Sequence, residues 1–170
     1  MGILSGNPKD EPLHYGEVFD IWSAQMVGNN MITCYQTMLN HAGDKDLKKL
    51  LTEAIELCQQ QKVQVETILK ENGIGLPPAQ PEPPEACLED IPVGARIPDP
   101  AIAAALSADI AAEMVLCSQV IGKSVREDVA MIFGQFHNQK AALGAKTLRL
   151  NKEKGWLIPP PLHLNKHQDC

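Results

Sequence analysis

The sequence predicts an all-α protein: a four-helix bundle with a long proline-rich crossover between the second and third helices. The chain has 170 residues, a length that favours a single domain with its own core. Aromatic residues make up 4% of the composition, so aliphatic side chains must fill that core, which favours helices over strands. Seven of the 13 prolines fall between residues 74 and 98, and they divide the helical pattern into two pairs.

The first half of the chain predicts an extended arm followed by two helices. Residues 1–12 are polar and contain Gly and Pro, so we expect an arm. Apolar residues then recur at helical spacing over about 13–42 and, most regularly, over 44–72. Gly28 weakens the first helix, and Gly43 with Asp44 predicts a stop and an N-cap, hence a tight turn.

The second half predicts a crossover, two further helices and a tail. Residues 74–98 form the crossover, because proline cannot donate to a helix ladder. Asp99-Pro100 is typical of a helix start, and that helix extends to about residue 121, with Gly122 as its stop. The segment Ser124-Val-Arg-Glu127 matches a capping box and opens the last helix, over about 125–154, which Gly155 ends. Residues 159–170 are expected to be an extended tail.

The connection lengths predict how the four helices are arranged. Short turns make the first pair and the second pair antiparallel. The 25-residue crossover can reach about 80 Å when extended, more than the roughly 45 Å of a thirty-residue helix. The third helix can therefore start beside the start of the second, which is the ferritin-like arrangement. A linker between two independent hairpins is the alternative, but their one-sided apolar faces favour a single bundle over residues 13–158.

Charge and targeting signals exclude several classes of protein. The net charge of −6 argues against a nucleic-acid binder, which carries a basic face. We find no signal-peptide pattern and no segment near the roughly 20 apolar residues of a membrane span. The five cysteines lack the spacing of a disulfide framework or zinc site. We expect a cytoplasmic protein with no transmembrane segment.

A ferritin-like bundle raises the question of a metal centre. Di-iron bundles need Glu-x-x-His on two helices, and this sequence has no such motif. We therefore expect no catalytic residue, no cofactor and no enzyme activity. A weaker set of polar residues lies near mid-bundle, and it predicts either a metal site or a buried polar network: Asn29, Glu56, Cys58, Asp109, Glu113 and His137. The simpler interpretation is that Asp109 and Glu113 edge the apolar stripe and face solvent, because carboxylates are rarely buried unpaired.

The tail contains a second, fainter metal pattern. His163, His167 and Cys170 would meet on one face of a helix. Three prolines precede them, at 159–161, so we expect an extended tail in place of a helical site.

Short motifs along nearly the whole chain resemble a family of uncharacterised proteins from spore-forming bacilli. They are the opening Met1-Gly-Ile-Leu-Ser-Gly6 and its continuation to residue 16, Ile21-Trp22-Ser23, Ser124-Val-Arg126-Glu-Asp128, and Lys154-Gly155-Trp156-Leu-Ile-Pro-Pro160. Members are commonly labelled spore coat proteins, related to spore coat protein F. The resemblance implies a ferritin-like bundle and supplies no catalytic residues.

These observations lead to a functional hypothesis with two alternatives. We expect a non-enzymatic structural or interaction protein of the sporulating cell, deposited in the spore coat, whose partners are coat or cytoplasmic proteins or a second copy of itself. One alternative is a metal-binding bundle with a non-standard ligand set. The other is a protein that binds an apolar ligand between its helices.

Overall fold

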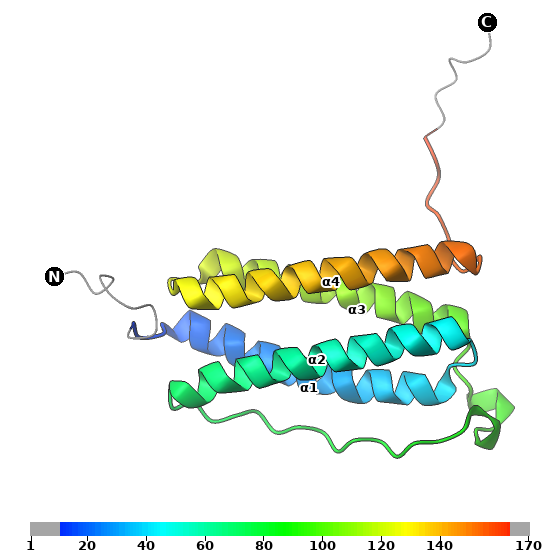
Figure 1. The fold of residues 1–170 in the computed structure, drawn as a ribbon, viewed down its shortest axis with the longest axis horizontal. Coiled ribbons are helices and arrows are strands. Elements are labelled where there is room, and N and C mark those ends of the chain that lie inside the picture. The colour runs from blue at the N-terminus through cyan, green and yellow to red at the C-terminus, as the bar shows by residue number, and fades with distance from the viewer. Residues whose placement is uncertain (1–10, 164–170) are drawn as a thin grey trace, which may run out of the picture.

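The computed structural model describes residues 11–163, and these residues form four long helices and no strand. The helices are α1 (Tyr15–His41), α2 (Lys45–Glu71), α3 (Asp99–Lys123) and α4 (Glu127–Glu153), and two short 3₁₀ turns, η2 (Leu88–Asp90) and η3 (Val93–Ala95), precede α3. They lie side by side as an elongated bundle (Figure 1). A helix of 27 residues, such as α1, is about 40 Å long. The predicted all-α four-helix bundle is confirmed.

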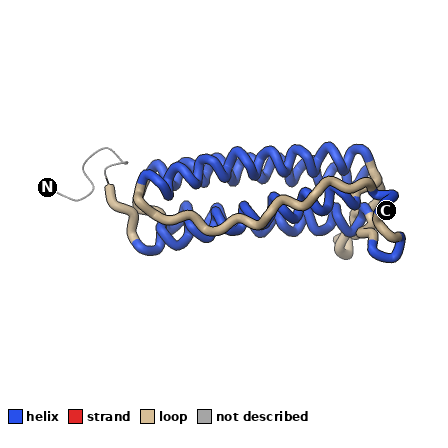
Figure 2. The backbone as a smooth tube through the Cα atoms, turned by 90° about the horizontal axis from the view of Figure 1, so that it is seen from below, coloured by secondary structure: helices blue, strands red, loops and turns tan. Residues whose placement is uncertain are grey.

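The crossover runs back along the whole bundle before α3 begins (Figure 2). α1 packs against α2, α3 packs against α4, and smaller contacts join α1 to α3 and α2 to α4. The amides of Gly43 and Asp44, in the α1–α2 turn, donate to the carboxylate of Asp99 at 2.8 and 3.0 Å. Since Asp99 opens α3, the third helix starts beside the start of the second, as the loop length predicted.

Side chains of α1 hold the crossover at both ends. Near its beginning, Trp22 Nε1 donates to the carbonyl of Gly75 at 3.1 Å. Farther along, the Asn40 side chain donates to the carbonyl of Pro84 and accepts from the amide of Ala86. Because proline-rich backbone forms few hydrogen bonds with itself, these contacts give the segment a fixed path.

The core divides into two apolar clusters, one toward each end of the bundle. One surrounds Leu106, Leu47 and Ile102, near the α1–α2 turn. The other contains Ile21, Phe133 and Phe136, whose rings meet edge to face with centroids 5.3 Å apart. Polar side chains lie between the two clusters and form the candidate site described below.

Every predicted helix end lies within two residues of the observed end, but the glycines near these ends differ in what they do. α1 continues through Gly28, since tertiary packing on both sides outweighs the weak helix propensity of that segment. α3 continues through Gly122 to Lys123. Gly43 does not adopt the left-handed conformation of a helix stop, whereas Gly73 and Gly155, each with φ 69°, do end their helices as predicted.

Two predicted N-caps also have other roles. The N-cap of α3 is Pro98, because the Asp99 carboxylate is engaged by the α1–α2 turn. The N-cap of α4 is Arg126, and Ser124 instead donates its hydroxyl to Val120 at the end of α3. Both errors share a cause: a polar side chain that would cap its own helix finds a partner elsewhere. Residues 1–10 of the predicted arm 1–12, and His167 and Cys170 of the predicted tail 159–170, lie outside the described residues.

Candidate functional site

Four of the buried polar side chains midway along the bundle, one from each helix, form a group. They are Tyr35 from α1, Cys58 from α2, Glu113 from α3 and Lys140 from α4, all less than 9% exposed. Lys140 Nζ lies 2.7 Å from Glu113 Oε1 and 3.4 Å from Cys58 Sγ. The short contact to Glu113 has the length of a charge-assisted hydrogen bond. We call these four residues the mid-bundle cluster.

Burial and the ion pair act against each other within the mid-bundle cluster. Burial raises the pKa of the Glu113 carboxyl, and the ammonium of Lys140 opposes that rise. Burial alone would lower the pKa of Lys140, but Cys58 and Glu113 outweigh it, so the lysine stays protonated. Burial also raises the pKa of Cys58 to about 11, and that of Tyr35 above its ordinary value. Both are therefore neutral at pH 7, and the cluster is a closed ion pair with two neutral neighbours.

A small cavity adjoins the mid-bundle cluster. Its volume is about 40 Å³, and its lining includes Gln25, Cys58, Glu113 and Lys140. Gln25 Oε1 and Glu113 Oε2 are buried and have no hydrogen-bond partner in the protein. A site of this size and polarity suits a single water molecule, whereas an apolar ligand such as benzene requires about 150 Å³.

The residues proposed from the sequence as metal ligands do not converge. Of the six residues, Glu113 and Cys58 enter the mid-bundle cluster, and Asn29 is buried on α1. Glu56 is exposed, while Asp109 and His137 are half-buried. Across residues 11–163, no group of three or more His, Cys, Asp or Glu side chains is placed to hold a metal ion. The simpler interpretation, that Glu113 faces solvent, is wrong: Glu113 is 8% exposed, and its burial is possible because Lys140 pairs with it. Glu113 therefore takes part in the buried polar network.

The mid-bundle cluster does not fit the metal that a ferritin-like bundle implies. A di-metal centre needs carboxylates that are free to ligate. Here the Lys140 ammonium occupies the position beside Glu113, and a protonated amine has no lone pair to offer a metal. The positive charge that a metal would supply to the carboxylate is supplied by the lysine.

The sequence analysis missed Lys140 and Tyr35, but heptad spacing could have found the lysine. Buried residues of α4 recur at alternating steps of three and four: Phe133, Phe136, Lys140, Leu143, Thr147 and Leu150. A lysine in that register faces the core. Glu113 occupies the matching register of α3, between Ile110 and Cys117. Two opposite charges in core positions of neighbouring helices predict a buried pair.

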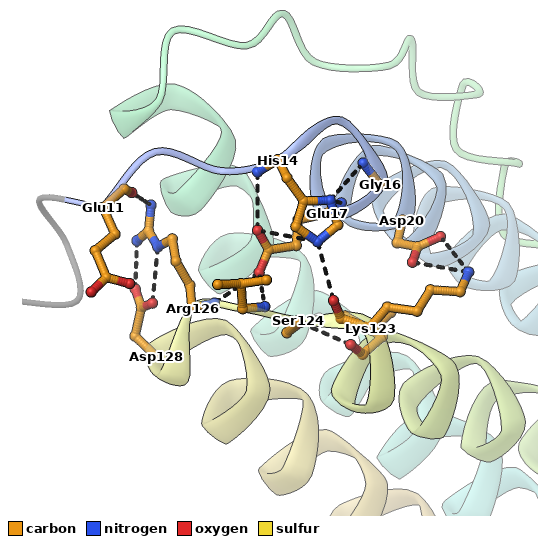
Figure 3. A network of polar contacts seen from close by, with 11 residues as sticks. Glu11, His14, Gly16, Glu17, Asp20, Lys123, Ser124, Arg126 and Asp128 are labelled. Atoms are coloured by element: carbon orange, nitrogen blue, oxygen red, sulfur yellow. Dashed lines mark hydrogen bonds and ion pairs between the residues drawn. The ribbon is translucent and has the colours of Figure 1, made fainter. Parts of the chain in front are cut away.

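A second polar network closes the end of the bundle where α1 begins (Figure 3). Glu17, 1% exposed, accepts hydrogen bonds from the amides of Val125 and Arg126 at 2.7 and 2.9 Å. It also accepts from the amide of His14 at 3.1 Å, which completes a capping box at the start of α1. One buried carboxylate therefore caps its own helix and binds the α3–α4 turn.

Arg126 extends this network across the same end. Its guanidinium forms a bidentate pair with Asp128, at 3.0 and 2.6 Å, and donates to Asn72 Oδ1 at 3.0 Å. The hydrogen bonds from Arg126 lower the pKa of Asp128. Arg126 also donates to the carbonyl of Glu11, so it joins α4, the end of α2 and the segment before α1. The motif Ser124-Val-Arg126-Glu-Asp128 thus contains both partners of this salt bridge.

The chain is similar in sequence and structure to proteins from bacilli. The model of a family described as "Protein of unknown function (DUF3231)" matches residues 1–168. Uncharacterized protein YvdQ of Bacillus subtilis (strain 168) is 66% identical over 170 residues, 100% of both chains. The crystal structure of a "putative spore coat protein" from Bacillus halodurans C-125 is 56% identical and has a TM-score of 0.92, covering 94% of this chain and 100% of that one.

More distant structures share the fold alone. A conserved hypothetical protein from Mycobacterium tuberculosis has a TM-score of 0.66 at 12% identity and covers 81% of this chain and 98% of its own. A DUF305 fragment from Deinococcus radiodurans has the same TM-score at 15% identity, covering 84% and 99%. At such identities nothing beyond the helical arrangement carries over.

Proposed function

The chain belongs to the DUF3231 family, and from that membership we propose that it is a non-catalytic structural or interaction protein of the sporulating cell, deposited in the spore coat. One observation carries the proposal. The chain matches a "putative spore coat protein" of known structure along the whole of that protein, at 56% identity. The proposal includes synthesis in the cytoplasm and the kinship with ferritin-like bundles and with spore coat protein F that the sequence motifs imply.

The chemistry of the described residues supports a structural role. Catalysis by acid and base needs titratable groups that can reach a substrate. Glu113 and Lys140 are instead paired with each other and buried, at 8% and 2% exposure. The thiol of Cys58 is neutral because burial raises its pKa to about 11, and a neutral buried thiol is a poor nucleophile.

The two alternative functions receive less support from the geometry. A metal-binding role would require Lys140 to move or lose its proton, against the pull of Glu113. An apolar-ligand role would require a larger space than the cavity of about 40 Å³ beside the mid-bundle cluster. The proposed partners are accordingly proteins, either other coat or cytoplasmic proteins or a second copy of this chain.

The location of the protein in purified spores tests the proposal. We expect quantitative mass spectrometry to find it in the detergent-extracted coat fraction of spores from its native host. An abundant cytoplasmic enzyme of the same cells serves as the control for contamination. Equal recovery of both proteins in the decoated core would contradict deposition in the coat.

Metal content separates the structural role from the metal-binding alternative. We expect the purified protein, loaded with Fe²⁺, Mn²⁺ or Zn²⁺ and desalted, to retain less than about 0.2 equivalents. The Glu113→Gln variant, which removes the carboxylate but keeps its shape, should retain the same amount. Stoichiometric metal in the wild type that is lost in Glu113→Gln would replace the structural proposal with the metal-binding one.

A further inference from the structure

The outward face of α3 carries no charge. Every exposed residue of this helix from Ala101 to Gly122 is uncharged, and most are small: Ala104, Ala108, Ala111, Ala112 and Val115 among them. Asp109 is half-buried and Glu113 is buried within the mid-bundle cluster. We call the exposed residues of α3 between Ala101 and Gly122 the α3 face.

The neighbouring helix α1 extends this uncharged surface. α1 contains no Asp, Glu, Lys or Arg between Ile21 and Asn40, and it exposes Phe19 at 68% and Met26 at 39%. On the exposed side of α2, by contrast, lie Lys48, Lys49 and Glu56. Between Ile21 and Asn40 of α1 and between Ala101 and Gly122 of α3, no charged side chain is exposed.

A helix that is apolar on all sides is normally covered on all sides. By length and composition alone, the segment Val93–Lys123 could cross a membrane, yet only 33% of its most apolar stretch is buried in the single chain. In the bundle α3 is packed against α4 and α1, and the residues of the α3 face stay exposed beside these contacts. Its outward side is left without a partner in one copy of the chain.

We propose that the α3 face, with the adjoining side of α1, binds the same surface of a second copy and forms a symmetric homodimer. α3 has 25 residues, a length of about 38 Å, and two adjacent helices give a width of about 20 Å. This length and width give a surface of about 750 Å² on each copy, close to the roughly 800 Å² that each partner buries in a stable interface. Alanine on both faces lets the helices approach closely, and a two-fold axis pairs each face with itself.

The charge of the chain favours a second copy over a lipid surface. Each copy carries a net charge of −6, so two copies repel one another except where they meet through an uncharged face. The same negative charge repels anionic lipid headgroups. Lys123, at one end of the α3 face, forms an ion pair with Asp20 at 3.2 Å. Because this carboxylate offsets its charge, Lys123 attracts an anionic lipid headgroup less strongly. The inference rests on the proposed function, which includes a second copy as a partner, and it names the surface that this copy binds. A monomeric protein would overturn the dimer, whereas the coat location is tested separately in purified spores.

Sedimentation equilibrium of the full chain tests the dimer. We expect the wild type to be a dimer at micromolar concentration. Ala108→Lys places a charge at an exposed position of the α3 face and should raise the dimer dissociation constant at least about 100-fold. Lysine is nearly as good a helix former as alanine, so the monomer should keep its fold, which circular dichroism checks. The matched control is Ala142→Lys, an exposed alanine of α4 beside Glu53 and Glu56, which should leave the dimer unchanged.

Three results would overturn the proposal. The first is a wild-type monomer at 100 µM, about 100-fold above the expected range for a stable dimer. The second is a dimer that Ala108→Lys and Ala112→Glu both leave intact, which would assign the interface to another surface. The third is a monomeric wild type that co-sediments with vesicles of phosphatidylcholine and phosphatidylglycerol, which would make the α3 face a lipid-binding surface.

Discussion

At each end of the bundle, a carboxylate from one helix pair accepts hydrogen bonds from the turn of the other pair. In the α1–α2 turn, the amides of Gly43 and Asp44 donate to Asp99. In the α3–α4 turn, the amides of Val125 and Arg126 donate to Glu17. The donors occupy equivalent positions, since each pair is the turn residue and the N-cap of the following helix.

The residues that end the second helix of each pair repeat the correspondence. Asn72 ends α2 and accepts a hydrogen bond from Arg126, the N-cap of α4. Lys154 ends α4 and donates to Asp44, the N-cap of α2, at 2.7 Å. A glycine with φ 69° follows each of them. The two helix pairs are thus related by an approximate two-fold arrangement, and the two ends can be compared contact by contact.

The two ends differ in how far water reaches them. Glu17 and Arg126 are 1% and 3% exposed. At the other end, the side chains of Lys154 and Asp46 are 29% and 53% exposed. A hydrogen bond stabilises a protein mainly when the groups it satisfies would otherwise be buried without a partner. The hydrogen bonds between carboxylate and turn should therefore stabilise the fold much more at the Glu17 end than at the Asp99 end.

The largest effect is expected for Glu17→Ala. The variant leaves two backbone amides of the α3–α4 turn without an acceptor, and the Arg126 amide is buried. At about 1–3 kcal/mol for each unsatisfied buried group, we expect a loss of about 3 kcal/mol in the free energy of unfolding. Urea denaturation measures it. A loss below about 1 kcal/mol would show that water satisfies this turn as easily as the other, and the contrast between the ends would disappear.

A smaller loss, about 1–2 kcal/mol, is expected for Asp128→Asn. It removes the carboxylate that forms the bidentate pair with Arg126 and leaves the guanidinium with neutral acceptors. Removing one partner of a fully buried pair can cost about 3–5 kcal/mol, but Asp128 is partly exposed, which reduces the effect. Arg126 lowers the pKa of Asp128, so its contribution is present above the unfolded-state pKa near 3.9 and is lost as the pH falls through the folded-state pKa.

The acid dependence gives this second prediction an independent measurement. Urea denaturation of the wild type and of Asp128→Asn should give a constant difference from pH 7 to about pH 5. The two stabilities should converge as the pH falls below the unfolded-state pKa near 3.9 and through the lowered folded-state pKa of Asp128. A difference that persists undiminished at pH 2.5 would mean that the aspartate acts through its shape and not its charge.

Asp99→Ala is the counterpart of Glu17→Ala at the exposed end. It also removes the acceptor for two turn amides, but the amide of Gly43 is exposed and water can replace the carboxylate. We expect a loss of about 1 kcal/mol or less in the free energy of unfolding, measured under the same urea conditions. If this loss equalled that of Glu17→Ala, the contribution of each carboxylate to the free energy of unfolding would depend on its position in the fold and not on its burial.

These comparisons show what the sequence could predict. The helices and the crossover follow from apolar spacing and proline content, which are local patterns. Glu17 and Asp99 look like ordinary residues of a first helical turn, and their partners lie 108 and 56 residues away. Cys58 and Glu113 could be placed at mid-bundle by counting from the turns. Lys140 could not be paired with them by that count, because the pairing depends on the rotation of α4 about its axis.

The smallest effect is expected for Lys154→Met, and its salt dependence distinguishes the two ends. Lys154 donates to Asp44 and Asp46, and its hydrogen bonds lower the pKa of both. The side chains of Lys154 and Asp44 are 29% and 20% exposed, and that of Asp46 is 53% exposed. Because solvent reaches all three, we expect a small destabilisation at 10 mM salt that vanishes in 1 M NaCl, where charges are screened within about 3 Å. It should also decrease as the pH falls below the unfolded-state pKa near 3.9 and through the lowered folded-state pKa of the aspartates. The loss in Glu17→Ala should stay the same in 1 M NaCl, since unsatisfied buried amides carry no net charge for salt to screen. Equal salt sensitivity in the two variants would mean that both ends are held by surface charge.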